Sequence, residues 1–293
     1  MAVERGVSHI TEPVVAVAAR LPRWATLVRA PNPGPMTLEG TNTWVLKASG
    51  ATHTIVVDPG PAHDDHLRAV AAHGPVAAVL VTHGHPDHIG GVARFRELTG
   101  VAPRRAAELR AGERIAGLRV TALPTPGHTA DSVTYVVEDD QERAVLTGDT
   151  ILGRGTTVVA WPDGDLGDYL ASLARLTEFS GAPVLPGHGP ALTDCGAAAA
   201  YYLAHRRARL DQVRAALAAG ATAPAEIVAR VYPDLDQTLR ASAELSVRAQ
   251  LAYLRDNPTN DYSPESGDSA SSAPLPPLAG RESHPGQLPL DEP

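Results

Sequence analysis

Apolar residues recur along the chain with two periods, and each period predicts a different kind of element. Short apolar or alternating runs are typical of strands, and they occur at residues 43–47, 54–58, 76–81, 119–123, 132–137 and 144–146. Apolar residues three and four apart are typical of helices, and they occur at residues 64–72, 89–98 and 168–179. We therefore expect an α/β protein with two sets of strands, each with covering helices.

From about residue 198 the pattern is helical throughout. The candidate helices are residues 201–219, 224–231 and 241–254. Residues 203–255 carry eight arginines and five acidic residues, whereas the whole chain has a net charge of −8. This excess of +3 allows two interpretations, a phosphate-facing surface or a solvated helical face, and its small size favours the second.

The last stretch of the chain, residues 256–293, has a different composition. Seven acidic residues and one arginine lie among many Pro, Ser and Gly residues, with few large apolar side chains. Such a segment buries too little surface to order itself, so we predict a disordered tail in preference to a folded acidic module. The expected division is a catalytic domain at 1–200, a helical module at 201–255 and the tail.

Composition favours a cytoplasmic protein. The 293 residues include one cysteine, Cys195, which excludes an internal disulfide. Glu4, His9 and Glu12 interrupt any apolar run that could serve as a signal peptide. No stretch approaches the roughly 20 apolar residues of a membrane span. We expect no membrane association, and no obligate protein partner is evident.

The densest chemistry lies in the heptapeptide Thr-His-Gly-His-Pro-Asp-His at residues 82–88. It holds four metal-competent side chains directly after the predicted strand at 76–81: His83, His85, Asp87 and His88. A loop that leaves a strand can turn alternate side chains toward one point, whereas a continuing strand sends neighbours to opposite faces. The alternative, a polar turn with incidental histidines, must explain four coincidences at once. The segment therefore predicts a metal site.

Three further candidate ligands stand in loops rich in Gly, Pro and Thr: His128, Asp149 and His188. Seven ligands are too many for one tetrahedral zinc, which takes three or four, so the set suits two ions. The first ion would be held by His83, His85 and His128. The second would be held by Asp87, His88 and His188, with Asp149 bridging the two. We expect two Zn²⁺, with Mn or Fe as alternatives.

Other polar residues have secondary roles in this hypothesis. Asp58 ends a predicted strand, and it is expected either to hydrogen-bond a ligand histidine or to cap a turn. Thr82 and Thr129, next to ligands, are expected to act in the same supporting way. The remaining histidines of this half of the chain are interpreted as surface or loop residues: His53, His63, His66 and His73.

The ligand motif His83-x-His85-x-Asp87-His88, followed by His128, Asp149 and His188, resembles the metallo-β-lactamase superfamily of binuclear metallohydrolases. Strings at 32–44, 54–60 and 148–153, and the pair His205-Arg206, are similar to its β-lactamase-like protein 2 branch. The resemblance runs over about residues 25–255. It implies a four-layer αββα sandwich with the metal site at one edge between the sheets. It also implies a small C-terminal helical module of winged-helix type, although no hairpin wing is evident after Leu254.

The resemblance implies hydrolysis. Two cations about 3.5–4 Å apart lower the pKa of a shared water from about 15.7 toward about 7, and the bridging hydroxide attacks a carbonyl or a phosphorus. The expected catalytic residues are Asp87 and Asp149. Asp87 would orient the nucleophile or relay its proton, and Asp149 would fix the spacing of the metals.

The expected substrate is single-stranded RNA, because the best-known members of the branch are endoribonucleases. Arg206 and Arg209 lie on one helical face and would bind phosphate. The alternative is a thioester, as in glyoxalase II, or another acyl substrate. The net negative charge of the whole chain favours this alternative. A β-lactamase fits less well, because such enzymes typically carry Cys or no bridging carboxylate where Asp149 stands. A binding or redox protein is disfavoured by the complete ligand set.

Overall fold

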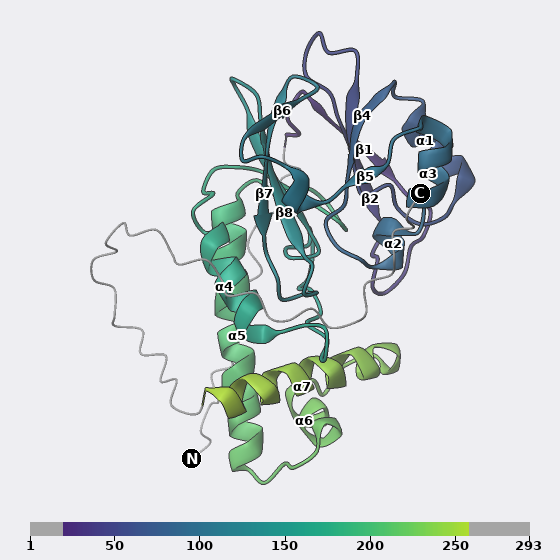
Figure 1. Cartoon of the computed structure of the whole chain (residues 1–293). Helices are drawn as coiled ribbons and strands as arrows, with labels where there is room; N and C mark the ends of the chain where they lie inside the picture. Colours follow the sequence, from purple (N-terminus) through teal and green to yellow (C-terminus); the bar gives the residue numbers. More distant parts are fainter. Residues whose placement is uncertain (1–19, 258–293) are drawn as a thin grey trace. The chain divides into compact units, whose positions relative to one another are not determined.

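A pair of five-stranded mixed sheets forms the centre of the computed structural model, which describes residues 20–257 (Figure 1). The first sheet has the order β1 (Ala25–Arg29), β2 (Asn42–Leu46), β3 (Thr54–Val57), β4 (Val76–Leu80), β5 (Pro103–Arg104). The second has the order β10 (Val184–Pro186), β9 (Arg143–Gly148), β8 (Val133–Glu138), β7 (Leu118–Pro124), β6 (Glu113–Ile115). Each predicted strand is present, with ends shifted by one or two residues.

Alternation of side chains along each strand builds the core between the sheets. On β2, Trp44 and Leu46 face the second sheet and pack with Tyr135 and Leu146 in one buried cluster. The residue between them, Val45, faces the other way and joins a different cluster. Because helices cover the outer faces, β2 and β3 are buried along their whole length, and each ends in a run of three apolar residues.

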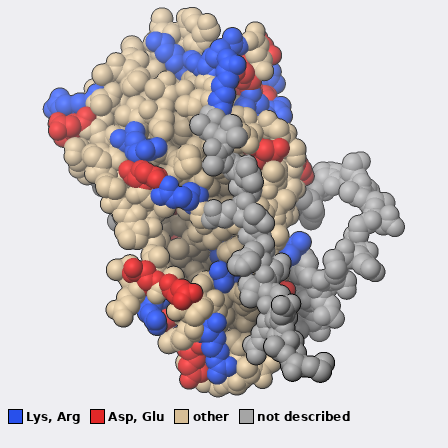
Figure 2. Space-filling model, turned by 180° about the vertical axis from the view of Figure 1, so that it is seen from behind, with Lys and Arg blue, Asp and Glu red and all other residues tan. Residues whose placement is uncertain are grey.

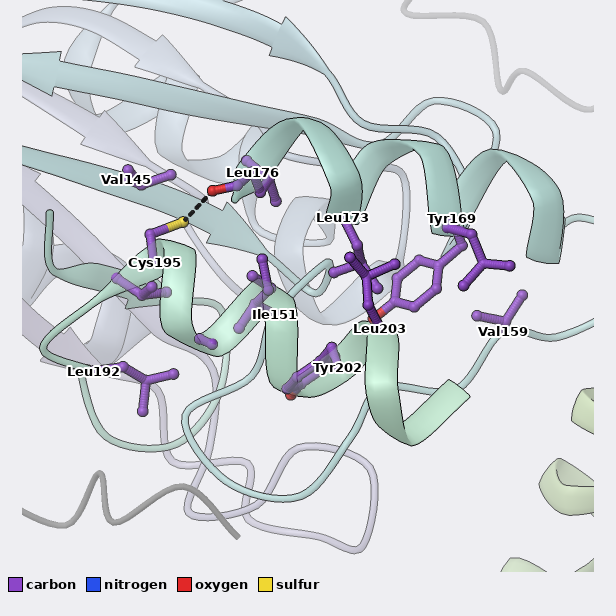
Figure 3. Packing of buried hydrophobic residues seen from close by; sticks show 14 of the residues in the cluster. Val145, Ile151, Val159, Tyr169, Leu173, Leu176, Leu192, Cys195, Tyr202 and Leu203 are labelled. Carbon is purple, nitrogen blue, oxygen red and sulfur yellow. Dashed lines mark hydrogen bonds between the residues drawn. The ribbon is translucent and has the colours of Figure 1, made fainter. Parts of the chain in front are cut away.

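Helices complete the outer layers of the sandwich. On the first sheet, α1 (Asp64–Ala71) and α3 (Val92–Thr99) contribute Leu67 and Phe95 to the cluster around Val45. On the second sheet, α4 (Leu166–Leu176) and α5 (Cys195–Ala218) pack around Val145 in the cluster of Figure 3. The four-layer αββα sandwich is therefore confirmed.

The helix expected at residues 89–98 is present and ends before Gly100, but it begins three residues later than predicted, at Val92. The structure has a short α2 (Pro86–Ile89) and then α3, with Gly90 and Gly91 between them. The backbone of Gly91 donates to Gly60 O at 2.8 Å, and a Cβ there would lie 2.8 Å from Pro61 O. This close approach of two loops needs glycine. It places Asp87 and His88 on a separate turn that faces the site.

The C-terminal helices form their own small core. α5 begins at Cys195, six residues before the predicted start, because the Asp194 side chain accepts from Ala197 N at 2.9 Å and caps the helix. α6 (Pro224–Val231) and α7 (Arg240–Asp256) enclose Val213, Ile227 and Val247. Within residues 20–257 no strand follows β10, so the helical module has no wing there.

The predicted boundary between residues 200 and 201 falls inside α5, and the division into two domains stays a prediction. The predicted acidic tail lies outside the described residues, apart from its first two positions. No helix in the described part of the chain is both long and apolar enough to cross a bilayer.

Candidate metal centre

All seven predicted ligands meet where four strands end. His83 and His85 follow β4, Asp87 and His88 lie on α2, and the others follow β7, β9 and β10: His128, Asp149 and His188. Side chains from both sheets therefore converge at one edge of the sandwich. Each ligand lies in a loop or short helix that directly follows a strand, so the packed sheets fix its position.

The first expected set of ligands is close enough to hold one ion. His85 Nδ1 lies 3.0 Å from His83 Nε2 and 3.1 Å from His128 Nε2. Nitrogen ligands stand about 2.0–2.1 Å from zinc, so tetrahedral ligands are about 3.3 Å apart. The three nitrogens thus have the spacing of ligands around a common ion.

The second set has the same spacing. His188 Nε2 lies 3.2 Å from His88 Nε2 and 3.1 Å from Asp87 Oδ2. Asp149 stands between the sets, with Oδ1 3.4 Å from His88 Nε2 and Oδ2 3.7 Å from His128 Nε2. Asp149 Oδ1 is buried and has no hydrogen-bond partner. A buried carboxylate oxygen without a donor suits a cation, so the residues fit a two-ion centre.

Four of the five histidines have a hydrogen-bond partner at the ring nitrogen that faces away from the metal site. His88 Nδ1 lies 2.8 Å from Asp58 Oδ2, and His128 Nδ1 lies 2.7 Å from Val158 O. The corresponding contacts of the other two are His83 Nδ1 to Thr82 Oγ1 at 3.1 Å and His188 Nδ1 to Gly40 O at 3.4 Å. Such contacts fix the tautomer and turn the other nitrogen toward the ion.

Asp58 is the main outer support of the site. Its Oδ1 accepts from Thr82 N at 2.8 Å and its Oδ2 from Thr82 Oγ1 at 2.7 Å, in addition to the contact with His88. Its φ of 52° lies in the left-handed region, which a non-glycine residue rarely adopts. The expectation that Asp58 hydrogen-bonds a ligand histidine is confirmed. Thr129 instead bonds within its own loop, to Asp131 and Ser132.

Burial and charge set the protonation of the site. Burial lowers the pKa of His83 well below its usual value, which favours the neutral imidazole that binds metal. Although burial opposes ionisation of Asp149, His88 and His188 hold the pKa of that carboxyl well below its usual range. Burial likewise opposes protonation of His188, yet Asp149 and Asp87 raise its pKa to about 9. The carboxylates therefore stay charged and attract cations.

Gly187 allows β10 to approach this cluster. A Cβ at this position would lie 2.5 Å from Asp149 Oδ1 and 2.7 Å from His88 Cε1. Any larger residue would have to displace two ligands. The Pro-Gly-His sequence that marks the His188 loop thus has a steric cause.

Two sequence-based expectations need correction. Arg206 is only 4% exposed, with its guanidinium over the Tyr169 ring and bonded to Thr157 O, so we withdraw the phosphate-binding role given to it. His66 is buried, not at the surface, and its Nε2 contacts Thr43 Oγ1 and Pro59 O. Arg209 is half-buried against the Tyr232 ring, and its proposed role stays untested.

Some residues of the site escaped the sequence analysis. The backbone carbonyl of Val158 holds His128, and Asn42 donates to Pro186 O and Gly189 O on both sides of His188. Thr41 Oγ1 lies 3.4 Å from Asp87 Oδ2. A backbone carbonyl carries no signal in the sequence. Asn42 and Thr41 lie in a Gly- and Thr-rich string, where only their position after a loop could have marked them.

Comparison with known proteins agrees with the ligand set. The family model described as "Metallo-beta-lactamase superfamily" matches residues 36–112 and 105–188. A lactamase-like protein of Penicillium aethiopicum is 31% identical over 245 residues, which cover 78% of this chain and 76% of that protein. An atrochrysone carboxyl ACP thioesterase of Aspergillus chevalieri is 35% identical over 206 residues, 65% of this chain and 64% of that protein.

Two further similarities also extend over more than three quarters of the chain. A β-lactamase-like protein 2 homolog of Caenorhabditis elegans is 28% identical over 252 residues, 78% of this chain and 83% of that protein. A crystal structure of a metallo-β-lactamase family protein from Thermus thermophilus has a TM-score of 0.66 at 25% identity, covering 80% of this chain and 94% of that one. The matched residues 36–188 include every predicted ligand. The chain therefore belongs to the metallo-β-lactamase superfamily.

Proposed function

We propose that the protein is a binuclear metal-dependent hydrolase that cleaves thioesters. The observation that supports a hydrolase most strongly is that two sets of ligands meet at Asp149. Its carboxylate lies near a histidine of each set, His88 and His128. Ligands rich in imidazole suit zinc, so zinc is the proposed ion. Asp87 and Asp149 are the proposed catalytic residues.

Divalent ions in such a centre polarise the substrate carbonyl and lower the pKa of water. Around them, Asp149 keeps the two sets of ligands together, while outer partners such as Asp58 hold the imidazoles in the binding tautomer. The side chain of Asp87 is 26% exposed, against 10% for Asp149, so Asp87 is the carboxylate that incoming water and substrate can reach. We assign it the proton that passes from the attacking water to the departing thiolate. Water adds to the carbonyl carbon, the C–S bond breaks, and a carboxylic acid and a thiol leave.

Three observations favour a thioester over RNA. Relatives at 30–35% identity are named as acyl carrier protein thioesterases. One of the two arginines predicted from the sequence to bind phosphate, Arg206, is buried instead. On the face shown in Figure 2, basic and acidic side chains of the described residues are interspersed and do not gather into one basic surface. A polyanion binds best to such a basic surface.

Cleavage of single-stranded RNA is the second candidate. It is favoured by the similarity to a β-lactamase-like protein 2 homolog, which extends over 83% of that relative and into the C-terminal helices of this chain. The same centre could also cleave RNA, because two bound metal ions would polarise a phosphorus as well as a carbonyl carbon. The arginines available for it are those of the helical module other than Arg206.

Parallel assays of zinc-loaded protein separate the two candidates. One assay measures thiol release from acyl-coenzyme A, acyl-pantetheine and S-lactoylglutathione, and the other measures cleavage of end-labelled single-stranded RNA. Asp149→Ala, purified identically, controls for contaminants. Thiol release by the wild type and none by the variant supports the proposal. RNA cleavage with the same dependence and no thiol release would replace it with the second candidate.

A further inference from the structure

Arg206 is a buried cation outside the cluster of ligands, and the proposed reaction gives it no role. It lies on α5, 4% exposed, with its charged carbon 5.2 Å from the centre of the Tyr169 ring. Its Nη2 donates to Thr157 O, while its Nε has no partner. No carboxylate within residues 20–257 forms an ion pair with it. A buried guanidinium without a carboxylate is destabilising, so stability alone does not account for this residue.

The contact of Arg206 is one of a series along the loop at residues 150–158. Tyr169 on α4 donates its hydroxyl to Thr150 O at 2.7 Å. On α5 the Tyr202 hydroxyl accepts from Leu152 N at 2.9 Å and donates to Gly155 O at the same distance. Figure 3 shows these two tyrosines extending from α4 and α5 into one buried cluster. Three side chains thus hold this loop at its start, middle and end.

The loop runs between two parts of the metal centre. It begins directly after Asp149, and it ends at Val158, whose carbonyl lies 2.7 Å from His128 Nδ1. The residue that Arg206 binds, Thr157, precedes Val158 and also places its own Oγ1 3.4 Å from the same nitrogen. A shift of the Thr157 peptide would therefore move the acceptor that fixes the tautomer and direction of His128.

From this geometry we infer that Arg206 is a positioning residue for His128: by holding Thr157, it sets the carbonyl that turns His128 Nε2 toward the first ion. The inference rests on the metal centre proposed above. It also explains the asymmetry of the support. His88 receives an aspartate from the first sheet, Asp58, whereas His128 depends on a backbone carbonyl that α5 must hold in place. The side chains of Asp87, His88 and His188 form no hydrogen bond or ion pair with this loop, which meets them through the backbone, where Gly153 N donates to His188 O at 2.9 Å.

The test is a zinc titration of the full chain against a chromophoric chelator, which yields one dissociation constant for each site. Loss of an outer partner typically weakens metal binding about 10–100-fold. For Arg206→Met we expect this change in one constant only, with the other unchanged. Arg209→Met is the matched control, because Arg209 contacts Gln212, Val231 and Tyr232 and no part of the loop. It should leave both constants unchanged.

A second experiment, in protein that already carries another substitution, shows which of the two metal sites Arg206 affects. In His128→Ala protein, which lacks the ligand itself, adding Arg206→Met should produce no further loss of zinc affinity. If Arg206→Met does not fold, two separate single variants, Tyr202→Phe and Arg206→Lys, make the same test on the same loop. Unchanged constants in a folded variant, or equal weakening of both sites, would overturn the inference while leaving the metal centre in place. A wild-type protein that binds no zinc would overturn both.

Discussion

Asp58→Asn tests how the outer partners control the metal ligands. The substitution keeps the size of the side chain, and Oδ1 can still accept from Thr82 N, as it does at 2.8 Å. At the Oδ2 position an NH₂ group replaces the oxygen that lies 2.8 Å from His88 Nδ1. Two donors cannot face each other, so His88 must carry its proton on Nε2. That is the nitrogen that faces His188 and the ion.

The magnitude follows from this exchange of tautomers. Loss of an outer partner reduces metal affinity about 10–100-fold, which corresponds to about 1.4–2.7 kcal/mol. The metal-free protein also loses a buried hydrogen bond to a charged group, which contributes about 1.5–3 kcal/mol. We therefore expect weaker binding at the site of His88 together with a lower free energy of unfolding of the metal-free protein. The site of His128 should change less, because Asp58 reaches it only through Thr82, whose Oγ1 lies 3.1 Å from His83 Nδ1.

Zinc titration against a chelator measures the first effect, and urea unfolding of the metal-free protein measures the second. Asp65→Asn, on the exposed face of α1, removes the same charge without touching the site and serves as the control. Wild-type affinity at both sites in Asp58→Asn would refute the argument that Asp58 fixes the tautomer of His88.

Four further predictions concern single residues. Asp149→Ala should lose one or both ions and nearly all hydrolysis, as measured by metal analysis and thiol release; full retention would refute the bridging role. Gly187→Ala should weaken zinc binding at the site of His88, because the new Cβ overlaps two ligands; unchanged chelator titrations would contradict this. Burial raises the pKa of the Cys195 thiol to about 12, so a thiol reagent at pH 8 should label it only after unfolding. Burial, with two neighbouring arginines, lowers the pKa of His205 to about 4. The unfolded chain then binds more protons between pH 6.5 and 4, and stability falls as the pH drops through this range. Urea midpoints of metal-free His205→Gln should show a smaller fall.

The residues that sequence analysis identified lie in short motifs, even where the motifs themselves are far apart in the chain, as at His128, Asp149 and His188. The heptapeptide at 82–88 puts four ligands within one loop, and the strand before it is a plain apolar run. The position of Asp58 at the end of a strand was likewise sufficient to suggest its contact with a ligand. Such features depend on spacing along the chain, and residues that are neighbours in the sequence remain close together in the folded protein.

The residues that were missed or misassigned depend on contacts distant in sequence. Arg206 follows an exposed-looking helical pattern, and only the arrival of Tyr169 and Thr157 against α5 buries it. The break between α2 and α3 comes from the approach of Gly91 to Gly60, which lies 31 residues earlier in the chain. The carbonyl of Val158 bears no side-chain signal at all. Tertiary packing decides each of these, and a single sequence does not reveal it.

The number of metal ions bound per chain is the most direct measure of the binuclear centre. The purified full chain is saturated with zinc, freed of excess metal by gel filtration and analysed by plasma mass spectrometry against its protein concentration. We expect two ions per chain, because the two sets of ligands share Asp149 and each has the spacing of a metal site. A firm value of one ion per chain would contradict the binuclear centre.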